Sequence, residues 1–257
     1  MDFVLKEEHG FSYIDEGEGE VLLLLHGLMG ALSNWDKVIE EFKSEYRVII
    51  PVLPIYDLPL LTTGVKTLAK FVHKFVRYKK LTDITILGNS LGGHVALIYV
   101  LAHPEGVKSL VLTGSSGLYE NAFGGSFPRR GSYDFVKEKV EYTFYDPKTA
   151  TKELVDDVFR IVNDRHSVIR ILSMAKSAIR HNMNKDLRNI HMPVALIWGK
   201  NDKITPPEVA VEFHKELPDS ELYWIDHCGH APMMEQPEEF NRALKGFLDK
   251  LKVKAKV

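Results

Sequence analysis

The chain has 257 residues, of which 45% are hydrophobic and 26% charged, and its formal net charge is −2. This length suits one large α/β domain or one domain with an insertion, and the charge gives no electrostatic reason to expect nucleic acid or an anionic membrane as a partner. The single cysteine, Cys228, excludes an internal disulfide framework. No signal peptide and no membrane-spanning apolar run are apparent, so we expect a cytoplasmic protein. Its expected oligomeric state is a monomer or a homodimer.

The first half of the chain alternates strand and helix patterns. Short strands are expected at 3–5 and 11–15, joined by a turn that contains Gly10. Apolar runs such as 21–25 are typical of strands buried on both faces. The remaining strands are expected at 47–52, 84–87 and 107–112, and the helices between them at 34–42, 67–78 and 91–101. Such alternation predicts a doubly wound, mostly parallel sheet.

The pattern changes between residues 116 and 188. An irregular loop, rich in glycine, is followed by three helical patterns without a buried strand between them. Strands at 194–198 and 221–225 and helices at 207–217 and 237–251 then restore the alternation. The sequence therefore predicts a core formed by residues 1–115 and 189–257, with residues 116–188 inserted as a helical cap or lid over the carboxyl ends of the strands. The loop contains Gly117, Gly124, Gly125, Pro128 and Gly131, and the helices are expected at 133–142, 151–162 and 167–181.

The most informative motif is Gly88-Asn-Ser-Leu-Gly92, which lies between a buried strand and a helix. A sharp strand-to-helix turn projects the Ser90 hydroxyl from the sheet, and the two glycines remove Cβ atoms that would clash there. Ser90 is therefore the candidate nucleophile.

Two later strands end in residues that complete a catalytic triad. Asp202 follows the strand at 194–198 and His230 follows the strand at 221–225. We expect Ser90 to attack, His230 to accept its proton, and Asp202 to orient the histidine. The order Ser, Asp, His along the chain is the order found with this turn.

The oxyanion of the tetrahedral intermediate also needs hydrogen-bond donors. The turn His26-Gly-Leu-Met-Gly30 follows the strand at 21–25, which we expect to neighbour the strand that leads to Ser90. Backbone N–H groups of Leu28 and Leu91 are then predicted to converge on the negative charge. His26 is interpreted as a structural residue that holds this loop.

These motifs resemble those of α/β-hydrolase-fold serine hydrolases, from about residue 3 to residue 251. The resemblance implies an α/β-hydrolase fold, the triad above, and a cofactor-independent hydrolysis. Serine at position 90 argues against dehalogenases and epoxide hydrolases, which carry aspartate there. The segments that match are His26-Gly27, Gly88 to Gly92, Trp198 to Asp202 and Cys228-Gly-His-Ala-Pro232.

The resemblance leaves the substrate open. The turn around Ser90 is similar to that of meta-cleavage-product hydrolases, which cut a carbon–carbon bond in vinylogous β-diketones. The chain departs from their pattern at Leu28-Met29-Gly30, at Ala231 in place of an aromatic residue, and at 53–59 in place of an Asp-x-Pro-Gly-x-Gly loop. We therefore expect hydrolysis of a small or medium carboxylic ester, with carbon–carbon bond hydrolysis or ligand binding without turnover as alternatives.

Further residues are candidates for contact with the substrate. Asn89 lies beside the nucleophile, and Arg129 and Arg130 could bind a substrate carboxylate in a bidentate fork, although solvated loop charge is the simpler interpretation. His227, Cys228 and His230 do not make a convincing metal site, because one short loop rarely supplies three ligands. An apolar pocket could be lined by Phe123, Phe127, Tyr133 and Phe144.

Overall fold

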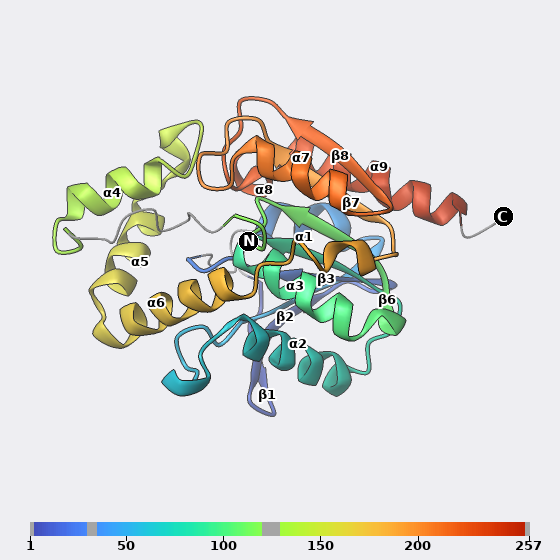
Figure 1. Ribbon diagram of the computed structural model, residues 1–257, viewed down its shortest axis with the longest axis horizontal. Helices are drawn as coiled ribbons and strands as arrows, with labels where there is room; N and C mark the ends of the chain where they lie inside the picture. The colour runs from blue at the N-terminus through green and yellow to red at the C-terminus, as the bar shows by residue number, and fades with distance from the viewer. Residues whose placement is uncertain (1–2, 30–34, 120–128, 255–257) are drawn as a thin grey trace.

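The computed structural model describes residues 3–29, 35–119 and 129–254. Its centre is an eight-stranded sheet of order β1-β2-β4-β3-β5-β6-β7-β8 (Figure 1). The two N-terminal strands pair antiparallel, and the strands from β4 to β8 in this order run parallel. The strands are β1 Lys6–Glu8, β2 Phe11–Glu16, β3 Glu20–Leu25, β4 Tyr46–Pro51, β5 Ile84–Asn89, β6 Val107–Thr113, β7 Val194–Gly199 and β8 Ser220–Ile225.

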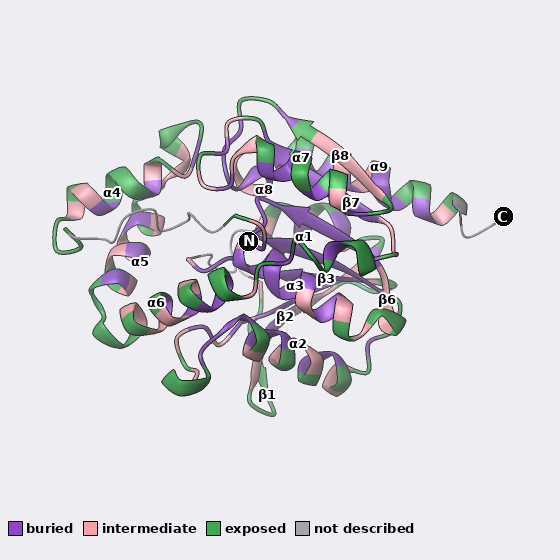
Figure 2. Cartoon of the chain, in the orientation of Figure 1, coloured by how far each residue is buried: buried purple, intermediate pink, exposed green. Residues whose placement is uncertain are grey.

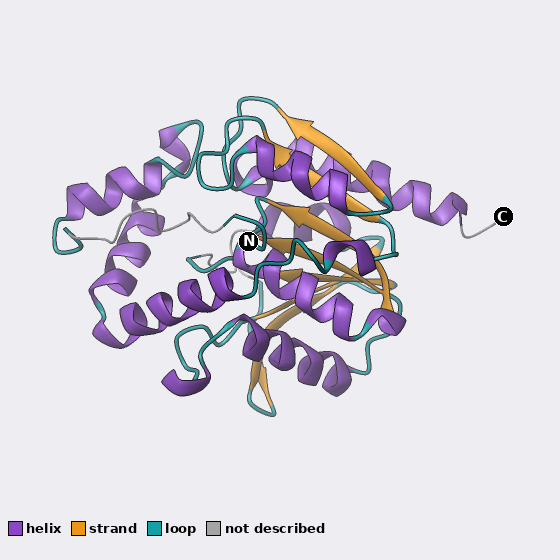
Figure 3. Cartoon of the chain, viewed as in Figure 1, coloured by secondary structure: helices purple, strands orange, loops and turns teal. Residues whose placement is uncertain are grey.

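Helices cover both faces of the sheet (Figures 1 and 3), and the sheet separates two apolar cores. One core packs α2, α3 and α7 against one face, and the other packs α1 and α9 against the opposite face. Figure 2 shows the central strands as a buried layer between these helices. The helices of the core are α1 Asp36–Phe42, α2 Val65–Lys79, α3 Leu91–Ala102, α7 Pro207–Glu216, α8 Pro232–Glu235 and α9 Pro237–Lys254, with the 3-10 turns η2 Leu60–Thr62, η3 Pro104–Gly106 and η5 Leu187–Asn189.

Between β6 and β7, the described part of the chain forms three α-helices. They are α4 Tyr133–Glu141, α5 Lys152–Asn163 and α6 Arg165–Arg180, with the turn η4 Pro147–Thr149 after α4. In Figure 1 they project to one side of the sheet. Ser132, Thr151 and Asp164 cap their N-termini through side-chain oxygens, which explains where each helix begins. The predicted fold class, a mostly parallel sheet with inserted helices, is confirmed. We call α4, η4, α5 and α6 the inserted helices.

Some predicted boundaries were wrong for local reasons. The first strand was expected at 3–5 but lies at Lys6–Glu8, because the hairpin turn at His9 and Gly10, both with positive φ, pairs Lys6 with Tyr13. This pairing satisfies backbone groups at a sheet edge, where polar side chains are tolerated, so hydrophobicity does not mark the strand. The short helix α8 was not predicted. The predicted positions Gly30, Phe123, Gly124, Gly125, Phe127 and Pro128 lie outside the described residues.

Candidate active site

Ser90 lies at the turn from β5 to α3 in a conformation that few non-glycine residues adopt. Its φ is 53° and its ψ is −119°. Such a backbone costs about 1–3 kcal/mol and persists only where surrounding contacts fix it. The Ser90 N–H donates to the carbonyl of Thr113 at 3.1 Å, and the Ser90 carbonyl accepts from the N–H of Ser116 at 3.0 Å. The end of β6 therefore holds the strained turn.

The two glycines of the motif allow this turn to pack tightly. A Cβ at Gly88 would lie 2.5 Å from the Cα of Gly93, and a Cβ at Gly92 would collide with the carbonyl of Leu25. Gly88 thus lets the strand approach its own helix, and Gly92 lets α3 approach the end of β3. The pattern of glycines seen in the sequence has this steric cause.

His230 and Asp202 form a buried pair at the ends of β8 and β7. His230 Nδ1 lies 2.9 Å from Asp202 Oδ2, and their side chains are 9% and 0% exposed. Since a carboxylate only accepts, this bond places the ring proton on Nδ1 and leaves Nε2 for other partners. A histidine fixed in this tautomer is suited to accept a proton at Nε2.

Thr205 binds the carboxylate of Asp202 and was not predicted from the sequence. Its hydroxyl donates to Asp202 Oδ2 at 2.8 Å and lies 3.2 Å from His230 Nδ1. The N–H groups of Ile204 and Thr205 donate to Asp202 Oδ1 at 2.8 and 2.9 Å, which is an Asx turn. Asp202 is therefore held by its own loop and does not cap α7, which has no side-chain cap. The spacing of Asp202 and Thr205 is the signal that could have predicted this turn.

The turn of Ser90 and the loop of His230 meet at the end of β6. Asn89 Nδ2 donates to the carbonyls of Thr113 at 3.0 Å and His230 at 3.2 Å. Gly114, which follows Thr113, has a φ of 50°, and a Cβ there would lie 2.8 Å from His230 Nδ1. These contacts give no support to the predicted substrate-binding role of Asn89, because its amide ties the two loops together.

His26 and Gly27 bring the loop after β3 to the same place. A Cβ at Gly27 would lie 3.2 Å from the Cβ of Ser90, so the two residues are neighbours. His26 Nε2 accepts from the N–H of Leu53 at 2.9 Å, and its Nδ1 donates to the Gly27 carbonyl at 2.9 Å. Burial lowers the pKa of His26, which keeps the ring neutral and consistent with one donor and one acceptor nitrogen. These contacts agree with a structural role.

The peptide between Gly27 and Leu28 carries one of the predicted oxyanion donors. Because the peptide is planar and trans, fixing the Gly27 carbonyl also fixes the direction of the Leu28 N–H. Leu91 is the first residue of α3, where N–H groups have no acceptor in the helix. Within the described residues, neither N–H is hydrogen-bonded. Leu91 directly follows Ser90, and Leu28 lies in the loop whose Gly27 neighbours Ser90.

Tyr56 is a second residue that the sequence analysis did not identify. Its hydroxyl donates to the Leu28 carbonyl at 2.5 Å, and burial raises its pKa, which keeps the hydroxyl protonated. Tyr56 belongs to the segment 53–59 in which the chain departs from the family loop. This departure from the family loop was the sequence signal that could have drawn attention to Tyr56.

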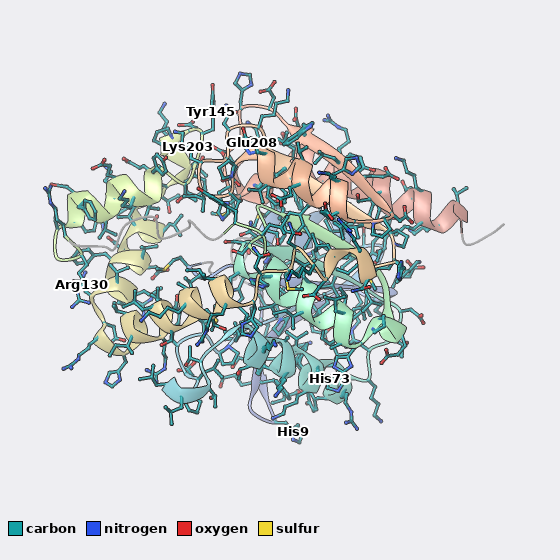
Figure 4. The ribbon with its side chains drawn as sticks, in the orientation of Figure 1. His9, His73, Arg130, Tyr145, Lys203 and Glu208 are labelled. Carbon is teal, nitrogen blue, oxygen red and sulfur yellow. The ribbon has the colours of Figure 1, made fainter. Side chains whose placement is uncertain are left out.

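The segment between α4 and η4 contacts the His230 loop through the main chain. The His230 N–H donates to the Thr143 carbonyl at 3.0 Å. Glu235 joins the same two segments, because its carboxylate accepts from the N–H of Gly229 at 2.5 Å and of Asp146 at 2.6 Å. Figure 4 shows Tyr145 in this region, where its ring lies 5.2 Å from that of His227.

The predicted arginines do not join this cluster. Arg129 and Arg130 are exposed in the turn before α4, and the Arg130 carbonyl accepts from Asn163 at the end of α5. Figure 4 places Arg130 at the outer end of the inserted helices, away from the sheet. Of the predicted apolar residues that are described, Phe144 is buried and Tyr133 is half-buried, both in the core on the α9 side of the sheet.

The loop after β8 does not gather metal ligands. The side chain of His227 is 69% exposed, whereas Cys228 is fully buried and burial raises the pKa of its thiol. No group of three or more His, Cys, Asp or Glu side chains suited to a metal ion occurs among the described residues. The same part of the chain contains no helix long and apolar enough to span a membrane.

Comparison with known proteins agrees with the fold. Residues 22–243 match the model of the alpha/beta hydrolase family. The chain therefore belongs to the alpha/beta hydrolase family.

Relatives and solved structures refine the comparison. The chain is 30% identical to the 2-hydroxy-6-oxo-6-(2'-aminophenyl)hexa-2,4-dienoic acid hydrolase of Metapseudomonas resinovorans, over 93% of this chain and 87% of that protein. It is 28% identical to the 2-hydroxy-6-oxononadienedioate/2-hydroxy-6-oxononatrienedioate hydrolase of Comamonas testosteroni, over 96% and 95%. The structure of MGS-MChE2, an alpha/beta hydrolase enzyme from the metagenome of sediments of the Mar Chica lagoon, Morocco, is 46% identical with a TM-score of 0.81, covering 96% of this chain and 98% of that one.

Proposed function

We propose that this hydrolase uses Ser90 as nucleophile, His230 as general base and Asp202 as the residue that orients the base. The observation that carries the proposal is the buried hydrogen bond between His230 Nδ1 and Asp202 Oδ2 at 2.9 Å. It supports the assignment because it presents Nε2 as the proton acceptor beside the strand end that holds Ser90.

The proposed reaction has two steps. Ser90 Oγ attacks the carbonyl carbon of the substrate while His230 Nε2 takes the hydroxyl proton, and His230 then gives that proton to the leaving group. A water molecule attacks the acyl-enzyme in the same way, with its proton passing through His230, and releases the acid. Asp202 remains ionised and stabilises the imidazolium that forms in each step. The reaction requires no cofactor.

The backbone N–H groups of Leu28 and Leu91 are the proposed oxyanion hole. Each donor of this kind contributes about 3 kcal/mol to the transition state. The proposal is supported by the His26 bond that fixes the Gly27 carbonyl, since this peptide then needs no reorganisation during the reaction.

Residues 116–188 are the proposed cap, set between core segments 1–115 and 189–257. The cap is the part of the chain from which substrate selection is expected, because the segment after α4 contacts the loop of His230 directly through Thr143 and, by way of Glu235, through Asp146. A small or medium carboxylic ester is the proposed substrate. Two features favour an ester. Arg129 and Arg130 are exposed, and no Lys or Arg is buried among the described residues. These residues therefore provide no buried cationic side chain to bind the carboxylate of a dienoate.

Carbon–carbon bond hydrolysis is the second candidate. The observation that favours it is that the relatives from Metapseudomonas resinovorans and Comamonas testosteroni are named as hydrolases of dienoic acids. A dienoic vinylogous β-diketone would use the same triad, with a carbanion in place of the alkoxide leaving group.

Steady-state kinetics with both substrate classes separate these candidates. We expect a larger kcat/KM for short p-nitrophenyl esters than for a dienoic vinylogous β-diketone, and loss of both activities in Ser90→Ala. A preference for the diketone that is also lost in Ser90→Ala would establish the second candidate instead. Tight binding without multiple turnover in the wild type would contradict both and indicate a ligand-binding protein.

A further inference from the structure

Two neighbouring helices of this chain carry only basic charges. α2 contains five Lys or Arg residues and α6 contains four, and neither contains Asp or Glu. The two helices contact each other, and α6 also contacts the turn η2. Figure 1 shows η2, α2 and α6 on the same side of the molecule. The overall charge of −2 conceals this local excess of positive charge.

The basic residues of α2 form an unpaired stripe. Lys66, Lys70, Lys74 and Arg77 are all exposed, and their spacing of four, four and three places them on one helical face. None of them forms an ion pair with a described residue, in contrast to Lys79, whose Nζ lies 3.0 Å from Asp15 Oδ2. Like charges one turn apart repel each other, so the stripe costs stability unless an anionic partner compensates it.

Exposed aliphatic side chains accompany this charge. Leu61 is 100% exposed and Leu60 is 47% exposed at η2, beside the first turn of α2. On the outer side of α6, large apolar residues alternate with basic ones. Those apolar residues are Ile169, Leu172 and Ile179, each 38% exposed or more, and the exposed basic residues are Arg165, Lys176 and Arg180.

Among the described residues, acidic side chains stand at the margins of this region, including Glu105, whose charge acts on His73 of α2. Asp57 precedes η2 and is exposed, and Asp164 is occupied as the N-cap of α6, where it accepts from the N–H of Ser167. Glu8 lies at the far end of α2, where it accepts from the hydroxyls of Tyr13 and Tyr78. The centre of the surface therefore presents positive and aliphatic groups together.

We propose that this surface, formed by Leu60, Leu61 and the exposed sides of α2 and α6, docks on an anionic lipid bilayer. Basic side chains next to a membrane are attracted to anionic headgroups, while exposed leucines enter the interfacial region. Aliphatic side chains distinguish this surface from one built for single-stranded nucleic acid, which uses aromatic side chains for stacking. Charge complementarity and the two exposed leucines thus select the same partner.

The position of the surface relates it to the candidate active site. η2 follows β4 and α6 belongs to the inserted helices, so both lie toward the carboxyl edge of the sheet, where β5 delivers Ser90. Arg170 joins them, because its Nε donates to the carbonyl of Leu58 at 2.8 Å. A docked molecule would hold this edge of the site near the bilayer, where a membrane-dissolved substrate is concentrated.

Co-sedimentation with vesicles tests the proposal without reference to catalysis. We expect the full chain to bind vesicles of equimolar phosphatidylglycerol and phosphatidylcholine, and not vesicles of phosphatidylcholine alone. The triple variant Lys66→Gln/Lys70→Gln/Lys74→Gln should bind about 100-fold more weakly, since each basic residue contributes about fivefold. Leu60→Ser/Leu61→Ser should weaken binding about tenfold at unchanged charge.

A matched triple variant controls for net charge. Lys245, Lys250 and Lys252 lie on α9, on the opposite face of the sheet, and pair with Glu45 or Glu221. Lys245→Gln/Lys250→Gln/Lys252→Gln should bind within twofold of wild type, and thermal melting should show that all variants are folded. The proposal is overturned if the wild type does not bind the anionic vesicles, or if the α9 variant loses as much affinity as the α2 variant. The proposal is also overturned if the leucine substitutions do not change vesicle binding and the wild type binds a single-stranded oligonucleotide more tightly than the anionic vesicles.

Discussion

The loops that hold Ser90, Asp202 and His230 differ from the inserted helices in how firmly their side chains are fixed. Asp202 and His230 are nearly inaccessible, and each takes part in hydrogen bonds within the core. On the inserted helices, by contrast, Leu172 and Ile179 are at least half exposed. We therefore expect the core to determine the reaction, and we propose the inserted helices as the region that selects the substrate.

The largest expected effect comes from changing the carboxylate of the core. Asp202→Asn places an amide against His230 Nδ1, and because this amide can donate, the ring proton moves to Nε2 and the base is lost. We expect kcat to fall about 10⁴-fold. Asp156→Asn is the matched control on α5, since Asp156 is also hydrogen-bonded, to Tyr133 at 2.7 Å, and it should change kcat less than twofold. Equal losses of kcat in the two variants would contradict the assignment of the reaction to the core alone.

The junction of the two regions is expected to weaken in acid. His94 on α3 donates from Nε2 to the carbonyl of His181, which follows α6, and burial lowers the pKa of His94 to about 4. The unfolded chain, in which the pKa is near 6.5, binds more protons between these values, so stability is complete above about pH 6.5 and falls as the pH drops toward 4. The loss amounts to about 3 kcal/mol.

Chemical denaturation between these pH values measures the effect. His94→Gln, whose amide can still donate to His181, should show a correspondingly flatter dependence of the free energy of unfolding on pH. If the two pH profiles run parallel, His94 does not contribute, and the acid sensitivity must come from other groups.

A glycine next to the base should be intolerant of substitution. Gly114→Ala adds a Cβ at 2.7 Å from the His230 carbonyl and 2.8 Å from Nδ1, at a φ of 50° that disfavours alanine. Displacement of the ring should lower kcat/KM about 10²-fold. Gly131→Ala is the control before α4, where an added Cβ meets nothing within 4 Å, and its kcat/KM should stay within twofold of wild type. A tolerant Gly114 would mean that the His230 ring can move without cost.

The smallest expected effect concerns the support of the proposed oxyanion loop. Tyr56→Phe removes the hydrogen bond to the Leu28 carbonyl, worth about 1 kcal/mol. We expect kcat to fall up to about tenfold with KM unchanged, because the loss concerns the transition state. Tyr142→Phe, at a half-exposed position after α4, should leave both constants unchanged. An increase in KM alone would assign Tyr56 to substrate binding instead.

The sequence predicted the parts of this molecule whose signals are local. The strand before Ser90, the flanking glycines and the polar residues after β7 and β8 are each readable within a few positions. Gly114 and Tyr56 were missed because their roles depend on contacts between loops far apart in the chain. Thr205 was missed although its spacing from Asp202 is a local signal of an Asx turn. The first strand was misplaced because backbone pairing, rather than hydrophobicity, determines it. The basic surface was missed because a net charge cannot report where charges lie.

The role of Ser90 is tested most directly by reaction with a fluorophosphonate probe, followed by mass spectrometry of the labelled peptides. The probe modifies a serine only where a base and an oxyanion site activate it. We expect a single labelled peptide that contains Ser90, and no labelling of folded Ser90→Ala. An unlabelled wild-type protein, or labelling that persists in Ser90→Ala, would contradict the proposed triad.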